Sequence, residues 1–109
     1  MELILYEQED GRCPFSDWVQ RLRDRQAQSR ILLRLQQVRA GNLGDYSSVG
    51  DGAMELRIHI GAGYRVYFGR SGAELVILLC GGDKDSQQKD IQRAKKLWAD
   101  WKRRHNDQK

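Results

Sequence analysis

The stretch ELRIHIGAGYRVYFGR, residues 55–70, is typical of two strands joined by a turn that contains glycine. Because alternate side chains of a strand point to opposite faces, one face is predicted to be apolar and the other to be polar and open. For the apolar faces of the two strands to lie on the same side of the sheet, the residue numbers of each cross-strand pair must sum to an even value. With a three-residue loop at 61–63, Arg57 is then predicted to lie opposite Tyr67, and His59 opposite Arg65.

These four polar residues would form a two-by-two block with facing Cβ atoms roughly 5 Å apart. Arginines offer donors to phosphate oxygens, and a histidine can move a proton near neutral pH. A tyrosine can stack on a base or donate to an oxygen. The block therefore predicts a catalytic site for a phosphodiester, made of Arg57, His59, Arg65 and Tyr67. An ordinary polar sheet face, on which Arg and Tyr pack across strands, stays open as the alternative.

Upstream of this hairpin, residues 2–6 are predicted to form a strand, and Pro14 begins a helix whose apolar residues repeat every three or four positions. Asp24 is predicted to cap a second helix, which ends at Gly41. Residues 42–52 contain three glycines and have no periodicity, so this segment is predicted to be a loop.

Downstream, the apolar run 75–80 is typical of a strand that is covered on both faces, which predicts a central place in the sheet. Asp85 and Gln88 resemble a capping box. The helix that follows has one apolar stripe, formed by Ile91, Ala94, Leu97, Trp98 and Trp101. Residues 103–109 are predicted to be a frayed tail.

The predicted element order is strand, helix, helix, strand, strand, strand, helix. Because the helices are grouped instead of alternating with the strands, this order indicates an α+β fold. We expect a mainly antiparallel four-stranded sheet with the helices packed on one face. At 109 residues, the chain fits a single domain, residues 1–109.

The distribution of charge favours a polyanionic partner. Lys and Arg number 19 against 15 Asp and Glu, which gives a net charge of +4. Eight basic and three acidic residues lie within 84–104, and neutralising phosphates releases condensed counterions. Lys84, Lys89 and Arg93 are therefore predicted to contact the phosphates of such a partner, and a solvated face with a steering role stays open as the alternative for the lysines of the last helix. The glycines at 81–82, ahead of a helix start, could receive an anion or could simply end the strand.

The cysteines and the apolar segments suggest an ordinary intracellular protein. Cys13 and Cys80 belong neither to a CxxC pair nor to a set with metal spacing, so we expect no disulfide framework and no metal or other cofactor. The sequence has no segment typical of a signal peptide or a membrane span. We therefore expect a cytoplasmic protein.

Two motifs, ELRIHIGAGYRVYF at 55–68 and LLCGGDKDSQQKDIQRAKKLW at 78–98, resemble the RelE/ParE toxin superfamily of bacterial toxin–antitoxin modules. Within it the chain is most similar to the HigB-like group of addiction module killer proteins. The resemblance implies a RelE-like fold and a ribosome-dependent mRNA endoribonuclease, or mRNA interferase, which inhibits translation without a metal. It also implies that the partners are the ribosome with its mRNA and a cognate helix-turn-helix antitoxin.

By the same resemblance, Arg65 contacts the phosphate, Arg57 is a second donor and Lys84 lies among further active-site residues. HigB-like enzymes often have a histidine and acidic groups near the end of the last strand, whereas this chain has Asp83 and Lys84 there. His59 is then the expected proton carrier, with Tyr67 as its partner. A ParE-like DNA gyrase poison and a non-catalytic module that binds the antitoxin as a co-repressor remain alternatives.

Overall fold

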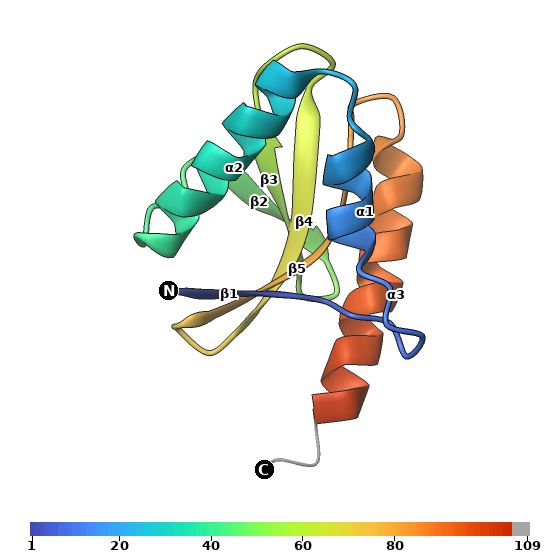
Figure 1. The fold of residues 1–109 in the computed structure, drawn as a ribbon. Coiled ribbons are helices and arrows are strands. Elements are labelled where there is room, and N and C mark those ends of the chain that lie inside the picture. Colours follow the sequence, from blue (N-terminus) through green and yellow to red (C-terminus); the bar gives the residue numbers. More distant parts are fainter. Residues whose placement is uncertain (106–109) are drawn as a thin grey trace.

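Five strands form one sheet through the middle of the protein (Figure 1), in the computed structural model that describes residues 1–105. The strands are β1 (Glu2–Leu5), β2 (Tyr46–Gly50), β3 (Ala53–Ile58), β4 (Tyr64–Ser71) and β5 (Leu75–Gly82). Their order is β1-β5-β4-β3-β2. Only the β1–β5 pair is parallel, and the other pairs in this part of the chain are antiparallel. The α+β class and the mainly antiparallel sheet are therefore confirmed.

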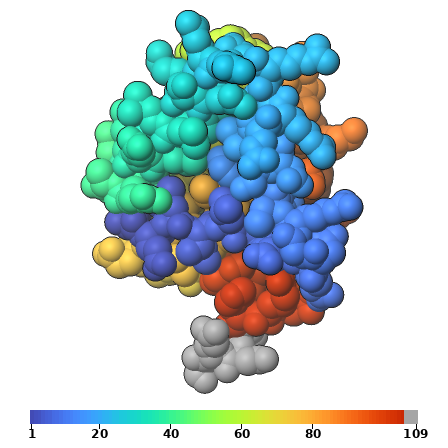
Figure 2. All heavy atoms as spheres, in the orientation of Figure 1, coloured from blue at the N-terminus to red at the C-terminus, as the bar shows by residue number. Residues whose placement is uncertain are grey.

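The three helices cover both faces of the sheet. The two N-terminal helices, α1 (Pro14–Arg21) and α2 (Arg25–Arg39), pack on one face, and α3 (Gln87–His105) packs on the other. In Figure 2, α1 and α2 cover the near face, with a hollow between them. The expectation that all helices share one face is wrong, because β5 is apolar on both sides and its second side needs the apolar stripe of α3.

The sheet has five strands instead of the expected four, because part of the predicted loop pairs with β3. Tyr46 lies opposite Leu56, and the register shifts between Ser48 and Gly50. The chain then turns through Asp51, whose φ is 56°, into β3. The glycines of this segment thus serve a bulge and a tight turn within a hairpin, which a search for periodicity alone does not detect.

One predicted helix cap is confirmed and the other is wrong. Asp24 Oδ1 accepts hydrogen bonds from the backbone N–H groups of Gln26 (3.0 Å) and Ala27 (3.2 Å). Before α3, the Asp85 side chain accepts no hydrogen bond from any described residue, and the carboxylate that binds backbone N–H groups in the turn ahead of the helix is that of Asp83. Asp83 Oδ1 accepts from the N–H groups of residues 85 and 86 at 3.0 and 3.1 Å. The turn therefore begins directly after β5, earlier than the capping-box pattern suggested.

The C-terminal helix is longer than predicted. Residues 103–105 were expected to fray but belong to α3, where Arg104 forms an ion pair with Asp100 at 3.0 Å. The rest of the predicted tail, residues 106–109, lies outside the described residues.

Both cysteines are free, and burial raises the pKa of the Cys80 thiol to about 12. Over residues 1–105, we find no helix with the length and apolarity needed to cross a membrane.

Candidate active site

The β3–β4 hairpin keeps its predicted faces but shifts its register by two residues. Arg57 lies opposite Arg65, Ile58 opposite Tyr64 and Glu55 opposite Tyr67. The loop is residues 59–63, closed by a hydrogen bond from Gly63 N–H to the Ile60 carbonyl at 3.0 Å. The predicted pairs of Arg57 with Tyr67 and of His59 with Arg65 are therefore wrong. The two arginines face one another directly.

A buried carboxylate, Glu55, lies between these two guanidiniums. Its side chain is 2% exposed and accepts hydrogen bonds from Arg57 Nη1 at 3.1 Å, Gln87 Nε2 at 2.9 Å and the Tyr67 hydroxyl at 3.2 Å. Arg65 Nε is 3.6 Å from the same carboxylate. A buried charge is tolerated when it is paired and hydrogen-bonded, and here it also offsets the repulsion between the arginines.

Tyr67 does not lie on an open face, as the sequence predicted. Its ring is fully buried, because α3 packs over this half of the hairpin. Burial, followed by the charge of Glu55, raises the Tyr67 pKa above its ordinary value. Tyr67 is thus a neutral donor that holds Glu55 in place, and its ring does not reach a ligand at the surface.

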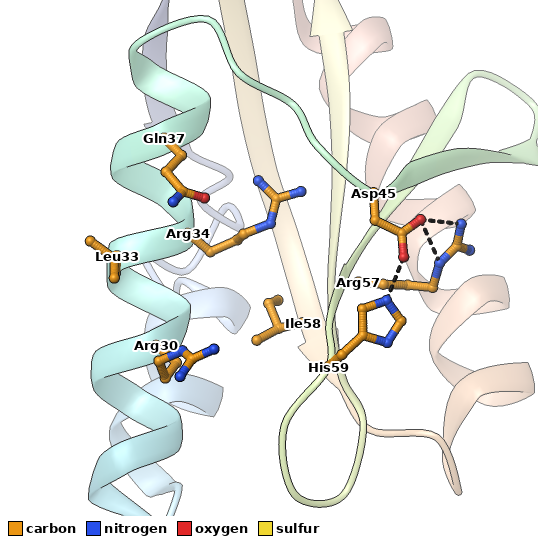
Figure 3. Close-up of a pocket in the computed structure, with 8 residues that line it drawn as sticks. All are labelled: Arg30, Leu33, Arg34, Gln37, Asp45, Arg57, Ile58 and His59. Atoms are coloured by element: carbon orange, nitrogen blue, oxygen red, sulfur yellow. Dashed lines mark hydrogen bonds and ion pairs between the residues drawn. The ribbon is translucent and has the colours of Figure 1, made fainter.

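The exposed end of the site is built around Asp45, between α2 and β2. Arg57 donates to Asp45 Oδ1 from Nε at 3.2 Å and from Nη2 at 2.8 Å, while Oδ2 lies 2.5 Å from His59 Nε2 (Figure 3). The hydrogen bonds from Arg57, and then from His59, hold the pKa of the Asp45 carboxyl well below its usual range. The other ring nitrogen of His59, Nδ1, has no hydrogen-bond partner within residues 1–105.

Two more cations approach the hairpin turn on the side of α3. Arg65 is largely buried, with 14% of its side chain exposed, and donates from Nη1 to the Gly63 carbonyl at 2.8 Å. Its Nε–H is buried and donates a hydrogen bond to no acceptor among the described residues. Lys84 is exposed, and its backbone N–H donates to the Ala62 carbonyl at 3.4 Å. A Cβ on Gly63 would lie 3.5 Å from both Arg65 Nη1 and Lys84 Cβ, so these side chains flank the glycine.

The other two predicted RNA-binding residues are not joined to this turn by any side-chain hydrogen bond or ion pair within the described part of the chain. Lys89 and Arg93 are both exposed on the first turns of α3, and neither side chain forms a hydrogen bond or an ion pair with any residue in 1–105. The structure therefore connects Arg57, His59 and Arg65 through the carboxylates of Asp45 and Glu55 and places Lys84 beside Arg65. Among the described residues, it shows no such contact that ties Lys89 or Arg93 to this group.

Sequence analysis missed Asp45, Ser47 and Gln87, whose side chains join this edge to other elements; Ser47 Oγ on β2 accepts a hydrogen bond from Arg57 Nη1 at 3.1 Å. Asp45 is positioned by an extension of the β2–β3 pairing, in which Arg57 N–H donates to the Asp45 carbonyl at 3.0 Å. The available signal was the strand-forming run Tyr46–Val49, between glycines. Gln87 opens α3, and its side chain contacts Glu55 across 32 residues of sequence.

Chemically, this edge combines donors for an anion with a group that can move a proton. The Asp45 carboxylate orients the His59 imidazole through Nε2, which leaves Nδ1 as the available acceptor. Arg57, Arg65 and Lys84 supply positive charge beside it. Within residues 1–105, no group of three or more His, Cys, Asp or Glu side chains is arranged to hold a metal ion.

Comparison with known proteins shows that this chain is similar to a bacterial protein. A protein of Haemophilus influenzae (strain ATCC 51907 / DSM 11121 / KW20 / Rd), described as uncharacterized, is 49% identical over 83 residues. The match covers 76% of this chain and 84% of the relative. No family model matches the sequence.

Proposed function

The chain belongs to the same family as this Haemophilus influenzae protein, and we propose that it is a toxin of a type II toxin–antitoxin module. Specifically, the proposal is a HigB-like member of the RelE/ParE superfamily that cuts mRNA on the ribosome and so inhibits translation. The element order β1-α1-α2-β2-β3-β4-β5-α3 contains the order expected for a RelE-like fold, with β2 as an additional strand at the sheet edge. A cognate helix-turn-helix antitoxin and a cytoplasmic location belong to the same proposal.

The observation that carries the proposal is the pairing of His59 with Asp45 beside two arginines. Arg57 and Arg65 lie opposite one another in the sheet, and the Asp45 carboxylate contacts both Arg57 and His59. An imidazole that is oriented by a carboxylate, next to guanidinium donors, suits proton transfer at a phosphodiester. A purely structural polar face has no need of an oriented and largely exposed histidine.

In the proposed reaction, the ribose 2′-hydroxyl attacks the adjacent phosphorus. His59 Nδ1 accepts the hydroxyl proton as the new P–O2′ bond forms. The P–O5′ bond then breaks, and the leaving 5′ oxygen receives a proton from the imidazolium through solvent. The products are a 2′,3′-cyclic phosphate and a 5′-hydroxyl end. Arg65 and Arg57 stabilise the negative charge on the non-bridging oxygens, and Lys84 adds positive charge.

The first test is inducible expression of the wild-type protein and of Arg65→Ala in a bacterial host, with mapping of the 5′ ends of cellular mRNA. Loss of one preorganised donor is expected to slow cleavage by about 10²–10³-fold. Arg21→Ala is the matched control, because Arg21 is exposed at the end of α1 and its replacement makes the same charge change away from the site. Since Arg65 lies near buried Glu55, His59→Ala serves as a second variant that changes an exposed side chain.

Growth arrest with cuts at ribosome-engaged codons, retained in Arg21→Ala and lost in soluble Arg65→Ala and His59→Ala, would support the proposal. Arrest without mRNA cuts, accompanied by DNA damage signalling, would contradict it and favour a gyrase poison. Expression of the folded wild-type protein without any arrest would contradict it as well and would favour a binding module.

A further inference from the structure

A groove of about 360 Å³ adjoins the candidate active site, between α2 and the end of β3 (Figure 3). One side is formed by the helix residues Arg30, Leu33, Arg34 and Gln37. Their spacing places them on a single face of α2, separate from the core-facing residues of the helix. The other side includes Arg57 and His59, so the groove and the candidate active site share two side chains.

The groove carries a net positive charge, because its arginines outnumber the single carboxylate that lines it. It is lined by three arginines and one acid, Asp45, and that acid is already bound to Arg57 and His59. Arg30 and Arg34 form no ion pair with any residue in 1–105. An anion that enters the groove would therefore meet the exposed guanidinium of Arg30 and the positive charge of Arg34, neither of which is neutralised by a bound carboxylate.

The position of Arg34 in the groove costs free energy, because part of its guanidinium is buried without a hydrogen-bond partner in residues 1–105. Its Nη2 donates to the Leu43 carbonyl, whereas its Nη1 is buried without a hydrogen-bond partner among the described residues. Burial lowers the Arg34 pKa from its ordinary value, and Asp45 offsets part of this effect. An arginine that served only to fix the loop after α2 would be expected to have its buried donors satisfied.

The lining also fits the rest of a nucleotide. Leu33, which is 51% exposed, offers apolar surface beside the largely buried Ile58, and the amide of Gln37 offers both a donor and an acceptor. Single-stranded RNA is read in this way, by stacking or apolar contact with the base and by hydrogen bonds to its edge. The volume lies near the lower end of the range for small-molecule sites.

We infer that this groove binds the nucleotide next to the scissile phosphate, with Arg30 on its phosphate, Arg34 adding positive charge behind it, and Gln37 on its base. The inference rests on the proposed function, because that function supplies the RNA strand. The inference adds a path for the RNA strand, which runs from the hairpin turn toward α2. It also names a residue that selects the base. Gln37 would thus set the base preference beside the cut.

Binding is tested by adding each of the four 5′-nucleoside monophosphates to ¹⁵N-labelled protein and recording amide spectra. Shifts are expected at the backbone of Ile58 and His59 and at the side-chain amide of Gln37. Gln37→Ala is expected to weaken binding about fivefold, the size of one net hydrogen bond. Gln36→Ala, an exposed neighbour on the same helix, is the matched control and should bind as the wild type does. Arg30→Ala removes a donor to the phosphate and is also expected to weaken nucleotide binding, and Arg39→Ala is its matched control at the end of the same helix.

The inference would be overturned if nucleotide at 20 mM, roughly the weakest binding of interest, caused no amide shifts in the groove. It would also be overturned if Gln36→Ala weakened nucleotide binding as much as Gln37→Ala does. A third contradicting result would be inorganic phosphate that matches the nucleotides in affinity and in amide shifts. The last result would mean that the base is not bound.

The cleavage assay separates this inference from the proposed function. In mapped mRNA, Gln37→Ala is expected to change the base composition beside the cut sites, whereas Gln36→Ala keeps the wild-type pattern. One result would overturn the inference about the groove and leave the proposed function standing. In that result, cleavage requires Arg65, the base composition beside the cuts is the same in Gln37→Ala as in the wild type, and nucleotides cause no amide shifts in the groove. Nucleotide binding in the groove without any mRNA cleavage would overturn the proposed function alone.

Discussion

Glu55 and Asp45 both bind the guanidinium of Arg57, yet their surroundings differ sharply. Glu55 is 2% exposed and has further donors from β4 and α3, whereas the Asp45 side chain is 44% exposed and contacts only β3 and the hairpin loop among the described elements. Breaking a buried ion pair leaves an uncompensated charge, while an exposed pair exchanges readily with water or another anion. The comparison separates a carboxylate that belongs to the fold from one that a ligand can replace.

This difference suits the two demands of the proposed reaction. Arg57 has to be held in place before RNA arrives, and its donors have to become available when RNA arrives. Glu55 meets the first demand through Nη1, and Asp45 meets the second because it occupies Nε and Nη2. A phosphate can take the place of Asp45 on Arg57 without disturbing the contact to Glu55.

The largest effect is expected for Glu55→Ala. The substitution leaves Arg65, Tyr67 and Gln87 facing an empty site, and breaking a buried pair typically costs about 3–5 kcal/mol in the free energy of unfolding. Urea denaturation followed by circular dichroism measures this loss. Asp45→Ala is the paired variant and should shift the midpoint much less. Equal shifts in the two variants would remove the distinction between the carboxylates.

The second effect concerns His59, the exposed partner of Asp45. His59→Ala is expected to slow mRNA cleavage by about 10²-fold, or about 2.7 kcal/mol in transition-state stabilisation, because a positioned proton carrier is lost. Its unfolding midpoint should stay close to that of the wild type, since the side chain is 73% exposed. Cleavage within about threefold of wild type would rule out His59 as the proton carrier.

A smaller effect is expected for Tyr67→Phe, which removes one donor to Glu55 and leaves Gln87 and Arg57 in contact with it. A hydrogen bond to a charged group contributes about 1.5–3 kcal/mol, and the remaining donors favour the lower end. Stability should fall by that amount in urea denaturation, while cleavage stays within about threefold because the ring is buried. A loss of about 10²-fold in cleavage with unchanged stability would instead make Tyr67 a proton donor.

The sequence predicts contacts between residues that are close along the chain better than contacts between residues that are far apart in it. The alternation of Leu56, Ile58, Val66 and Phe68 correctly predicted which hairpin face is apolar and that the register is even. It could not decide between a three-residue and a five-residue loop, because a shift of two residues preserves every side chain's face. Glycines at both 61 and 63 permit either turn, and both adopt positive φ in the structure.

The placement of α3 was within reach of the sequence. A strand that is apolar on both sides, such as residues 75–80, requires cover on both faces of the sheet. Helices on one face alone could not satisfy that requirement. The run Tyr46–Val49 could have indicated the strand beside Asp45, but the contacts of Asp45 with Arg57 and His59 could not be predicted, because they span 12 and 14 residues and depend on the pairing of an irregular edge strand. The surroundings of Glu55 likewise depend on Gln87, 32 residues away.

The smallest expected effect comes from the acid titration of Asp45. Its pKa is depressed in the folded protein, whereas an aspartate in the unfolded chain titrates near its ordinary value of about 3.9. The unfolded chain therefore takes up the proton first as the pH falls, and the contribution of Asp45 to stability is complete above about pH 5 and lost progressively below about pH 4. Asp45→Asn lacks this contribution, so its urea midpoint should lie below that of the wild type at pH 6 and approach it toward pH 3. Because the carboxylate is exposed, salt should reduce the difference. Midpoints that fall in parallel across this range would mean that Asp45 is not held by Arg57 and His59 in solution.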